Sequence, residues 1–292
     1  MKDYIIRATD EMGYFRFFVA KTTDLANEIR NIHESSATAT SAMGRLSTMA
    51  VMMGADLKGE NDQVTLKVNG NGPGGLLVAV ADSKGHVRVT ADRPEVDVPS
   101  NEATGKLDVA SYVGREGEIA IIKDYGLKNP YSGHSEIVSG EIAEDFAAYF
   151  YFSEQTPTVV SLGVLVDRDL SVLASGGLFV QVLPDTPEEE IIKLEEMIGR
   201  LKPISELIEE NMSPEDILNE YFSGLNLTIL GSQDVVYKCN CSRERIEQAL
   251  ISVPKEDIKE ILEEDGQAEV VCHFCNTKYI FDDKDLTKII ND

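Results

Sequence analysis

The chain has 292 residues, of which 42% are hydrophobic, and its formal net charge at pH 7 is −24. This length and composition are typical of a globular protein with room for two or three domains. The acidic charge argues against nucleic acid or anionic lipid as a partner, because both attract basic surfaces.

Two observations on the whole chain indicate its compartment. There is no apolar run of the roughly 18 residues that a membrane-spanning helix needs. The N-terminal stretch "MKDYIIRATDEMGYFRFF" scatters charges among its apolar residues, unlike a signal peptide. We therefore expect a cytoplasmic protein, and there a cluster of cysteines more often indicates metal or redox chemistry than a structural disulfide.

Residues 1–183 are predicted to form a mixed α+β domain. Residues 14–20 and 62–70 alternate as strands do, and residues 75–91 resemble a hairpin that turns at Ser83-Lys84-Gly85. Helices are expected at 35–58, where small residues suggest close packing, and at 140–155. The apolar runs 158–166 and 176–183 are typical of buried strands.

Residues 184–232 are predicted to be an acidic, helical connector. Between Asp185 and Glu220 there are twelve Asp or Glu and three Lys or Arg. Ser213 is the expected N-cap of a helix that has Pro214 at its first position. The apolar residues fall at helical spacing, so we expect a docked amphipathic helix pair. The residues of this stripe are Ile191, Leu194, Ile198, Leu201, Ile217, Leu218, Tyr221 and Phe222.

Residues 233–292 are predicted to form a small third domain. A strand leads into "CNC", two helices follow, and Gly266 ends the second of them. The segment "EVVCHFC", the strand "KYIF" and a short helix complete the chain.

Other motifs give little support to an enzyme. Gly70, Gly72 and Gly75 form a G-x-G-x-x-G, but a strand follows where a nucleotide site needs a helix, so we expect a turn between strands. Gly105-Lys106 resembles the end of a P-loop, but Leu107 stands in place of Ser or Thr. His33, His86 and His134 are scattered singly, as surface or hydrogen-bonded histidines are.

The four cysteines give the strongest signal. Cys239 and Cys241 form a C-x-C pair, and Cys272 and Cys275 form a C-x-x-C pair. Two such pairs can supply the four ligands of one structural Zn²⁺ with no position left open for a substrate. His273 could compete as a ligand, but four thiolates already complete the shell.

The C-x-C spacing also permits redox chemistry. Cysteines two residues apart on an extended segment can form a strained disulfide, and strained disulfides are the labile kind. Oxidation of both pairs would expel a metal, and a unit of this size with few large apolar residues should then unfold. The sequence thus permits a switch between a zinc-bound, folded state and an oxidised, loosened state.

On these cysteines the chain resembles the redox-regulated 33 kDa chaperonin family of bacterial heat-shock proteins. The resemblance extends over essentially the whole length, with no departure at the four cysteines. The matching stretches are "TATSAMGRL" (38–46), "GNGPGG" (70–75), "GKLDV" (105–109), 139–166, "ASGGLFVQVLP" (174–184) and 263–281.

The resemblance implies an ATP-independent holdase that is inactive while reduced and bound to zinc. Oxidation would form the disulfides Cys239–Cys241 and Cys272–Cys275 and release zinc. The connector would then lose its structure, the protein would dimerise, and exposed apolar surface would hold unfolding client proteins for ATP-dependent chaperones. The apolar stripe of the connector is our candidate for client binding.

Two other functions compete with this interpretation. A zinc-ribbon module of a protein or nucleic-acid complex is disfavoured by local charge, because residues 233–292 hold fourteen Asp or Glu and eight Lys or Arg. A thiol oxidoreductase would place its C-x-x-C at the start of a helix, whereas Cys272 follows an expected strand.

Overall fold

The structure is a computed structural model that describes residues 2–291, and it has the mixed α+β fold that the sequence predicts. The chain divides into two compact units between Tyr237 and Lys238. No helix within residues 2–291 combines the length and the apolar character needed to cross a membrane.

Two sheets form the framework of the first unit. One has five strands in the order β10-β1-β2-β9-β8, and all its neighbours are antiparallel. The other has six strands in the order β11-β5-β4-β3-β6-β7, in which only β11 runs parallel to its neighbour. The five-stranded sheet consists of β1 (Tyr4–Thr9), β2 (Phe15–Lys21), β8 (Thr158–Val166), β9 (Val172–Val182) and β10 (Thr228–Asp234). The six-stranded sheet consists of β3 (Gln63–Asn69), β4 (Leu77–Asp82), β5 (His86–Ala91), β6 (Glu118–Asp124), β7 (Tyr131–Glu136) and β11 (Val236–Tyr237).

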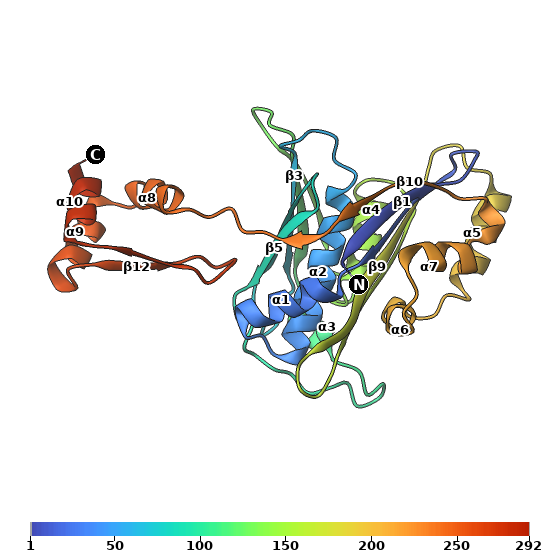
Figure 1. The fold of residues 1–292 in the computed structure, drawn as a ribbon, viewed down its shortest axis with the longest axis horizontal. Helices are drawn as coiled ribbons and strands as arrows, with labels where there is room; N and C mark the ends of the chain where they lie inside the picture. Colours follow the sequence, from blue (N-terminus) through green and yellow to red (C-terminus); the bar gives the residue numbers. More distant parts are fainter. Residues whose placement is uncertain (1, 292) are drawn as a thin grey trace. The chain divides into compact units, whose positions relative to one another are not determined.

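Helix α2 (Ala37–Gly54) lies between the two sheets (Figure 1). Sixteen of its 18 residues are buried, so other parts of the protein pack against nearly every side of the helix. Most of these buried side chains are small, or flexible like those of Met. Its Gly44 lies so close to β8 that a Cβ atom there would stand 2.9 Å from Cγ2 of Val164. The prediction of a closely packed helix in this region is therefore confirmed. Three further helices accompany it: α1 (Thr23–His33), α3 (Val109–Val113) and α4 (Ala143–Phe152).

Both faces of the five-stranded sheet are covered. In β2, Phe18 and Ala20 belong to the core that contains α2, whereas Phe17 and Val19 belong to a second core. Successive residues of a strand point to opposite faces, and both faces of this sheet are buried. The sequences of these strands are therefore continuous runs of apolar residues, without the alternation of apolar and polar residues seen when one face is exposed.

The connector helices cover the outer face of this sheet (Figure 1). They are α5 (Glu188–Ile198), α6 (Ile204–Glu209) and α7 (Pro214–Tyr221), followed by a 3-10 turn at Ser223–Leu225. The predicted cap of α7 is confirmed, because Oγ of Ser213 accepts a hydrogen bond from the Asp216 N–H at 3.1 Å. A second bond ties α7 to β1, where the Tyr4 hydroxyl donates to Oε2 of Glu215 at 2.5 Å.

Helix α6 sits on a pair of glycines. Gly163 of β8 and Gly176 of β9 are cross-strand partners. A Cβ atom at Gly163 would lie 2.9 Å from the backbone N and Cβ of Ser205, and one at Gly176 would lie 2.2 Å from Cδ1 of Ile208. The helix can approach the sheet this closely because neither strand carries a side chain there.

The glycine-rich stretch at 70–75 is a turn between β3 and β4, as the sequence predicts. Gly72 N–H and Gly74 N–H donate to the carbonyls of Val113 and Tyr112, at 2.9 and 3.0 Å. No helix follows, so a dinucleotide has no helix N-terminus to bind there.

The three single histidines of the first unit lie apart from one another in the fold. His33 is buried at the end of α1. Nδ1 of His86 lies 2.9 Å from Oδ2 of Asp82, and the exposed Ser132 Oγ lies 3.0 Å from Nε2 of His134.

The second unit is small. It contains α8 (Arg243–Ile251), α9 (Lys255–Glu264), a hairpin of β12 (Ala268–Val271) and β13 (Lys278–Phe281), and α10 (Asp283–Asn291). The predicted helices and the strand at 278–281 are present. Its buried core consists of Ile258, Ala268, Phe281, Leu286 and Ile289. Such a core supplies little stability by itself, so a unit of this size usually needs a disulfide or a metal.

The structure assigns α5–α7 and β10 to the first unit. The three-part division at 1–183, 184–232 and 233–292 describes regions of the sequence, and it stays a prediction.

Candidate metal centre

The C-x-x-C pair lies in the turn of the β12–β13 hairpin. The Cys272 N–H donates to the Thr277 carbonyl at 3.0 Å, and the Asn276 N–H donates back to the Cys272 carbonyl at 2.8 Å. Asn276 has a φ of 53°, the left-handed conformation that asparagine tolerates better than most residues. This tight turn brings the Cys272 and Cys275 side chains to the same side.

The C-x-C pair lies in an extended segment between β11 and α8. Ser242, the next residue, caps α8 by accepting a hydrogen bond from the Arg245 N–H at 3.3 Å. Helix α8 therefore cannot begin before Ser242. The two cysteines lie outside the helix, in residues without regular secondary structure, and their side chains reach the hairpin.

The fold brings all four sulfurs together. Sγ of Cys239 lies 3.7 Å from Sγ of Cys272, and Sγ of Cys241 lies 3.3 Å from Sγ of Cys275. All four sulfur atoms lie within 4.8 Å of one another, and all four are free thiols. Four sulfurs placed tetrahedrally at the usual Zn–S distance would be about 3.8 Å apart. The donor set and its spacing thus fit a tetrahedral ion that prefers sulfur.

The surroundings of the thiols perturb them unequally. Burial raises the pKa of Cys239, and it also raises that of Cys241 despite an opposing hydrogen bond from Tyr279. Burial raises the pKa of Cys275 as well, but hydrogen bonds to the side chain and backbone of Thr277, together with those to Cys241 and Cys239, outweigh it, and the pKa falls to about 7. The hairpin therefore favours the thiolate form, the one that binds metal, at Cys275.

Two neighbours of the cluster were missed in the sequence. The Tyr279 hydroxyl donates to Sγ of Cys241 at 3.1 Å, and this bond raises the pKa of Tyr279 to about 12. The Arg243 guanidinium lies 4.4 Å from the ring centre of Phe281 and pairs with Asp285 at 2.5 Å. Tyr279 could have been found from strand alternation, since Phe281 on the same face of β13 is buried.

His273 does not join the cluster. Its side chain is exposed, and the group of potential ligands in this part of the described chain consists of the four cysteines.

The candidate client-binding residues of the connector lie in the contact with the five-stranded sheet. Four of them, Leu194, Ile217, Leu218 and Phe222, are buried, and the Phe222 ring lies 5.1 Å from that of Phe17. The other four, Ile191, Ile198, Leu201 and Tyr221, are partly buried against the same core. Their role in binding stays a prediction.

Comparison with known proteins identifies the family. The model of the family described as "Hsp33 protein" matches residues 3–282. The chain belongs to the Hsp33 family. It is therefore a member of a family of chaperones.

Relatives agree along the full length. The chain is 45% identical over 292 residues to the 33 kDa chaperonin of Alkaliphilus metalliredigens, and the alignment covers all of both proteins. It is 47% identical over 286 residues to that of Oceanobacillus iheyensis, with 98% of each covered. The crystal structure of the 33 kDa chaperonin (heat shock protein 33 homolog) from Thermotoga maritima matches with a TM-score of 0.91 at 36% identity, covering 100% of this chain and 98% of that one.

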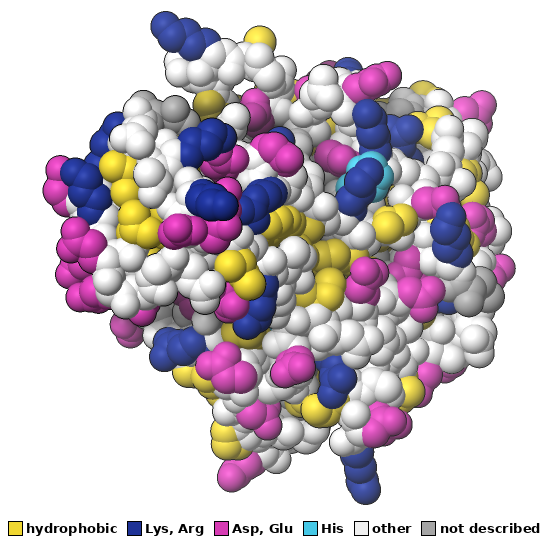
Figure 2. All heavy atoms as spheres, turned by 60° about the vertical axis from the view of Figure 1, so that its left-hand side comes forward, with side chains coloured by type: hydrophobic (Ala, Val, Ile, Leu, Met, Phe, Trp, Pro, Cys, Tyr) yellow, Lys and Arg dark blue, Asp and Glu magenta, His cyan; other side chains and the backbone are white. Residues whose placement is uncertain are grey.

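The surface charge is mixed on the face drawn in Figure 2. There the Lys and Arg side chains are interspersed with Asp and Glu rather than gathered in one basic patch. A phosphate backbone needs a continuous basic surface, which that face does not offer.

Proposed function

We propose that the chain is a redox-switched, ATP-independent holdase whose switch is the four-cysteine cluster. The observation that carries the proposal is the convergence of four thiol sulfurs within 4.8 Å, in a unit with a core of five buried side chains. Membership of the Hsp33 family supports the chaperone part of the proposal.

The reduced state would hold one Zn²⁺ through Cys239, Cys241, Cys272 and Cys275. Bound zinc would keep the sulfurs as thiolates and join the hairpin to the segment before α8. The site has four protein ligands and no open position, so the role of the ion would be structural. We infer that the protein is not an enzyme.

Oxidation would convert the four thiolates into two disulfides. For each pair, one peroxide molecule accepts two electrons: its O–O bond breaks, an S–S bond forms, and with two protons from solvent two water molecules leave. We propose the pairs Cys239–Cys241 and Cys272–Cys275. Disulfide sulfurs are poor ligands, so the zinc would be released and the second unit would lose much of its stability.

The connector would respond to this loss. Strands β10 and β11 follow the connector helices in the sequence and lead directly into the segment of Cys239. The connector and the cysteine cluster are therefore close neighbours along the chain. We propose that unfolding of the second unit loosens α5–α7, and that the apolar stripe then binds unfolding proteins. The three regions 1–183, 184–232 and 233–292 would act as core, connector and sensor.

The partners follow from the same proposal. We propose unfolded or oxidatively damaged proteins as clients, a homodimer as the active form, and ATP-dependent chaperones as the recipients of clients. Since the cycle needs a reducing compartment in its resting state, we propose the cytoplasm.

One experiment tests the switch. The reduced, zinc-loaded protein is treated with peroxide, while zinc release is followed with a chromophoric chelator and disulfides are mapped by mass spectrometry. We expect about one zinc released per chain, the two disulfides named above, and suppression of the aggregation of a thermally unfolding model protein only after oxidation.

Matched variants sharpen the test. Cys241→Ser should abolish stoichiometric zinc binding, whereas His273→Ala, inside the same turn, should leave it unchanged. The proposal is wrong if the oxidised protein releases zinc without suppressing aggregation, or if the reduced, zinc-loaded protein suppresses it equally well.

A further inference from the structure

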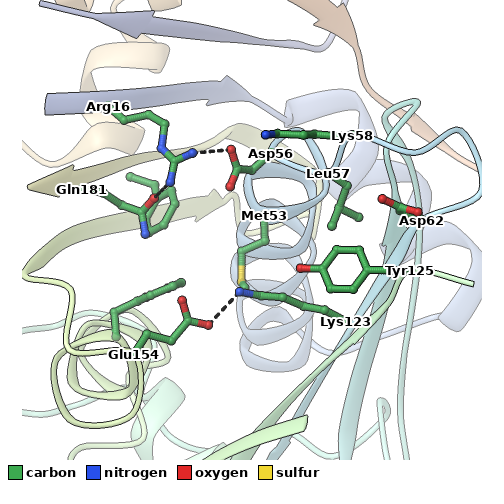
Figure 3. Close-up of a pocket in the computed structure, with 12 residues that line it drawn as sticks. Arg16, Met53, Asp56, Leu57, Lys58, Asp62, Lys123, Tyr125, Glu154 and Gln181 are labelled. Atoms are coloured by element: carbon green, nitrogen blue, oxygen red, sulfur yellow. Dashed lines mark hydrogen bonds and ion pairs between the residues drawn. The ribbon is translucent and has the colours of Figure 1, made fainter. Parts of the chain in front are cut away.

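A cavity of about 390 Å³ lies in the first unit between the two sheets. Strands β2 and β9 line one side, the end of α2 and the following loop line the top, the residues at the end of α4 lie below β9, and β6 with the residue after it closes the opposite side (Figure 3). This volume is within the range of small-molecule sites in proteins.

Apolar side chains form part of the cavity wall. Phe150 and Phe179 have ring centres 5.1 Å apart, and Met53 and Leu57 complete this surface. In Figure 3 the Met53 side chain extends into the middle of the space. Such a wall favours a ligand with an apolar body.

The carboxylates of the cavity are already satisfied. Oδ1 of Asp56 pairs with the Arg16 guanidinium at 2.6 Å, and Oε1 of Glu154 pairs with the Lys123 ammonium at 2.7 Å. Oδ2 of Asp62 accepts a hydrogen bond from the Gly59 N–H at 2.8 Å. A cationic ligand would therefore have to compete with existing partners.

The donors are in excess. The Lys58 ammonium has neither an ion pair nor a hydrogen bond among the described residues, and the same holds for the Tyr125 hydroxyl. Figure 3 shows the Tyr125 hydroxyl pointing toward Met53, into the space between the walls. The Lys123 ammonium donates one of its three N–H groups to Oε1 of Glu154 and has two left. Both the Lys58 and the Tyr125 side chains are exposed, so water solvates them and a ligand can reach them. The donors available at the cavity therefore favour a ligand that accepts hydrogen bonds and carries negative charge.

We propose that this cavity binds a carboxylate attached to an apolar body, with Tyr125 and Lys58 at the carboxylate and Phe150 and Phe179 against the apolar part. In Figure 3 the Lys58 ammonium points toward Asp56, so the Lys58 side chain would turn into the cavity to meet the carboxylate. The three basic and three acidic side chains of the wall cancel, so the site lacks the strong negative charge of the whole chain. This site is separate from the cysteine cluster and does not depend on the redox switch.

Two sources could supply this chemistry: a free small carboxylic acid, or the C-terminal residue of a peptide. A second hollow of about 420 Å³ shares Lys123, Tyr125 and Glu154 with the cavity and is lined by Tyr131 as well. It offers room for the preceding residues of a peptide.

Calorimetric titration of the full-length, reduced, zinc-loaded protein tests the proposal. The probes are 3-phenylpropionate, 3-phenylpropanamide, and a tetrapeptide that ends in phenylalanine with a free carboxylate. We expect saturable binding of the acid and at least about tenfold weaker binding of the amide, since a hydrogen bond to a charged group is lost. Binding of the tetrapeptide would identify a peptide end as the source, and its failure would identify a free acid.

Variants locate the binding. Lys58→Met should weaken binding of 3-phenylpropionate at least about tenfold, and Tyr125→Phe severalfold. Lys84→Met is the control, because it removes an equal charge from a residue that pairs with Glu60 outside the cavity. The proposal is overturned by equal binding of acid and amide, by an unchanged Lys58→Met variant, or by the absence of saturable binding.

Discussion

Replacing Gly163 by alanine should release helix α6 from the five-stranded sheet. The new Cβ would lie 2.9 Å from atoms of Ser205, whereas carbon atoms in contact prefer about 3.5–4.0 Å. Alanine fits the backbone of β8 at this position, since the φ of Gly163 is not positive. The helix must therefore move by roughly 1 Å or leave the sheet.

The free energy that holds α6 on the sheet is a small difference between two larger contributions. Burial of Ile204, Leu207 and Ile208 contributes about 1.5–3 kcal/mol each, or about 5–9 kcal/mol in total. Ordering the six residues of the helix costs about 1–2 kcal/mol each, or about 6–12 kcal/mol. An overpacking strain of about 1–3 kcal/mol is large enough to change the outcome.

Hydrogen exchange of the reduced, zinc-loaded protein measures the effect. We expect amides of residues 204–209 to exchange about tenfold to a hundredfold faster in Gly163→Ala than in the parent protein. If a released connector binds clients, this variant should also suppress aggregation without oxidation. Gly231→Ala is the matched control, because nothing lies within 4 Å of a Cβ atom at that position in the same sheet. Unchanged protection of α6 in Gly163→Ala, or an equal change in Gly231→Ala, would refute the reasoning.

Three further predictions concern single side chains. Burial raises the pKa of Asp3 from 3.8 to about 6, so its contribution to stability is complete below pH 3.8 and is lost as the pH rises through 6. In urea titrations the free energy of unfolding of Asp3→Asn, relative to the parent protein, should rise by about 2.5 kcal/mol between pH 4 and pH 7, and a constant difference would contradict the shift. Arg243→Gln loses the contact with the Phe281 ring and should weaken zinc binding about tenfold in competition with a chelator; an unchanged affinity would show that this contact does not support the site. Tyr4→Phe removes the bond to Glu215 and should speed exchange across residues 214–221 in the reduced protein by about tenfold or more, so equal exchange would exclude a stabilising role.

Sequence patterns found the elements whose apolar residues repeat regularly or have clear caps. Helix α7 was predicted from Ser213 and Pro214, and α2 from its length and its small residues. Strand β1 was missed because Ile5 and Ile6 are consecutive and are both buried, one in each core, so the strand shows no alternation. Strand β7, "YSGHSE", was missed for the opposite reason, since it is an exposed edge strand with almost no apolar residues.

The candidate site was predictable in its membership but not in its geometry. Paired spacing singled out the four cysteines. It could not show that Sγ of Cys239 lies 3.7 Å from Sγ of Cys272, or that Sγ of Cys241 lies 3.3 Å from Sγ of Cys275, because those distances depend on how the segment before α8 packs against the hairpin. Helix α1 could have been predicted from the sequence, since Leu25, Ile29 and Ile32 have helical spacing, but charged and polar residues separate these three positions.

The two cores that share strand β2 place unlike evolutionary demands on neighbouring residues. Phe18 and Ala20 face α2 and need only support the fold, so any replacement that packs equally well should be tolerated there. Phe17 and Val19 face the connector. In the proposed cycle they must be compatible both with the state in which the connector buries them and with the state in which they are exposed to solvent. Greater polarity would weaken docking, and greater apolarity would make the exposed state prone to self-association. Accepted substitutions should therefore differ in kind at every second position along this strand.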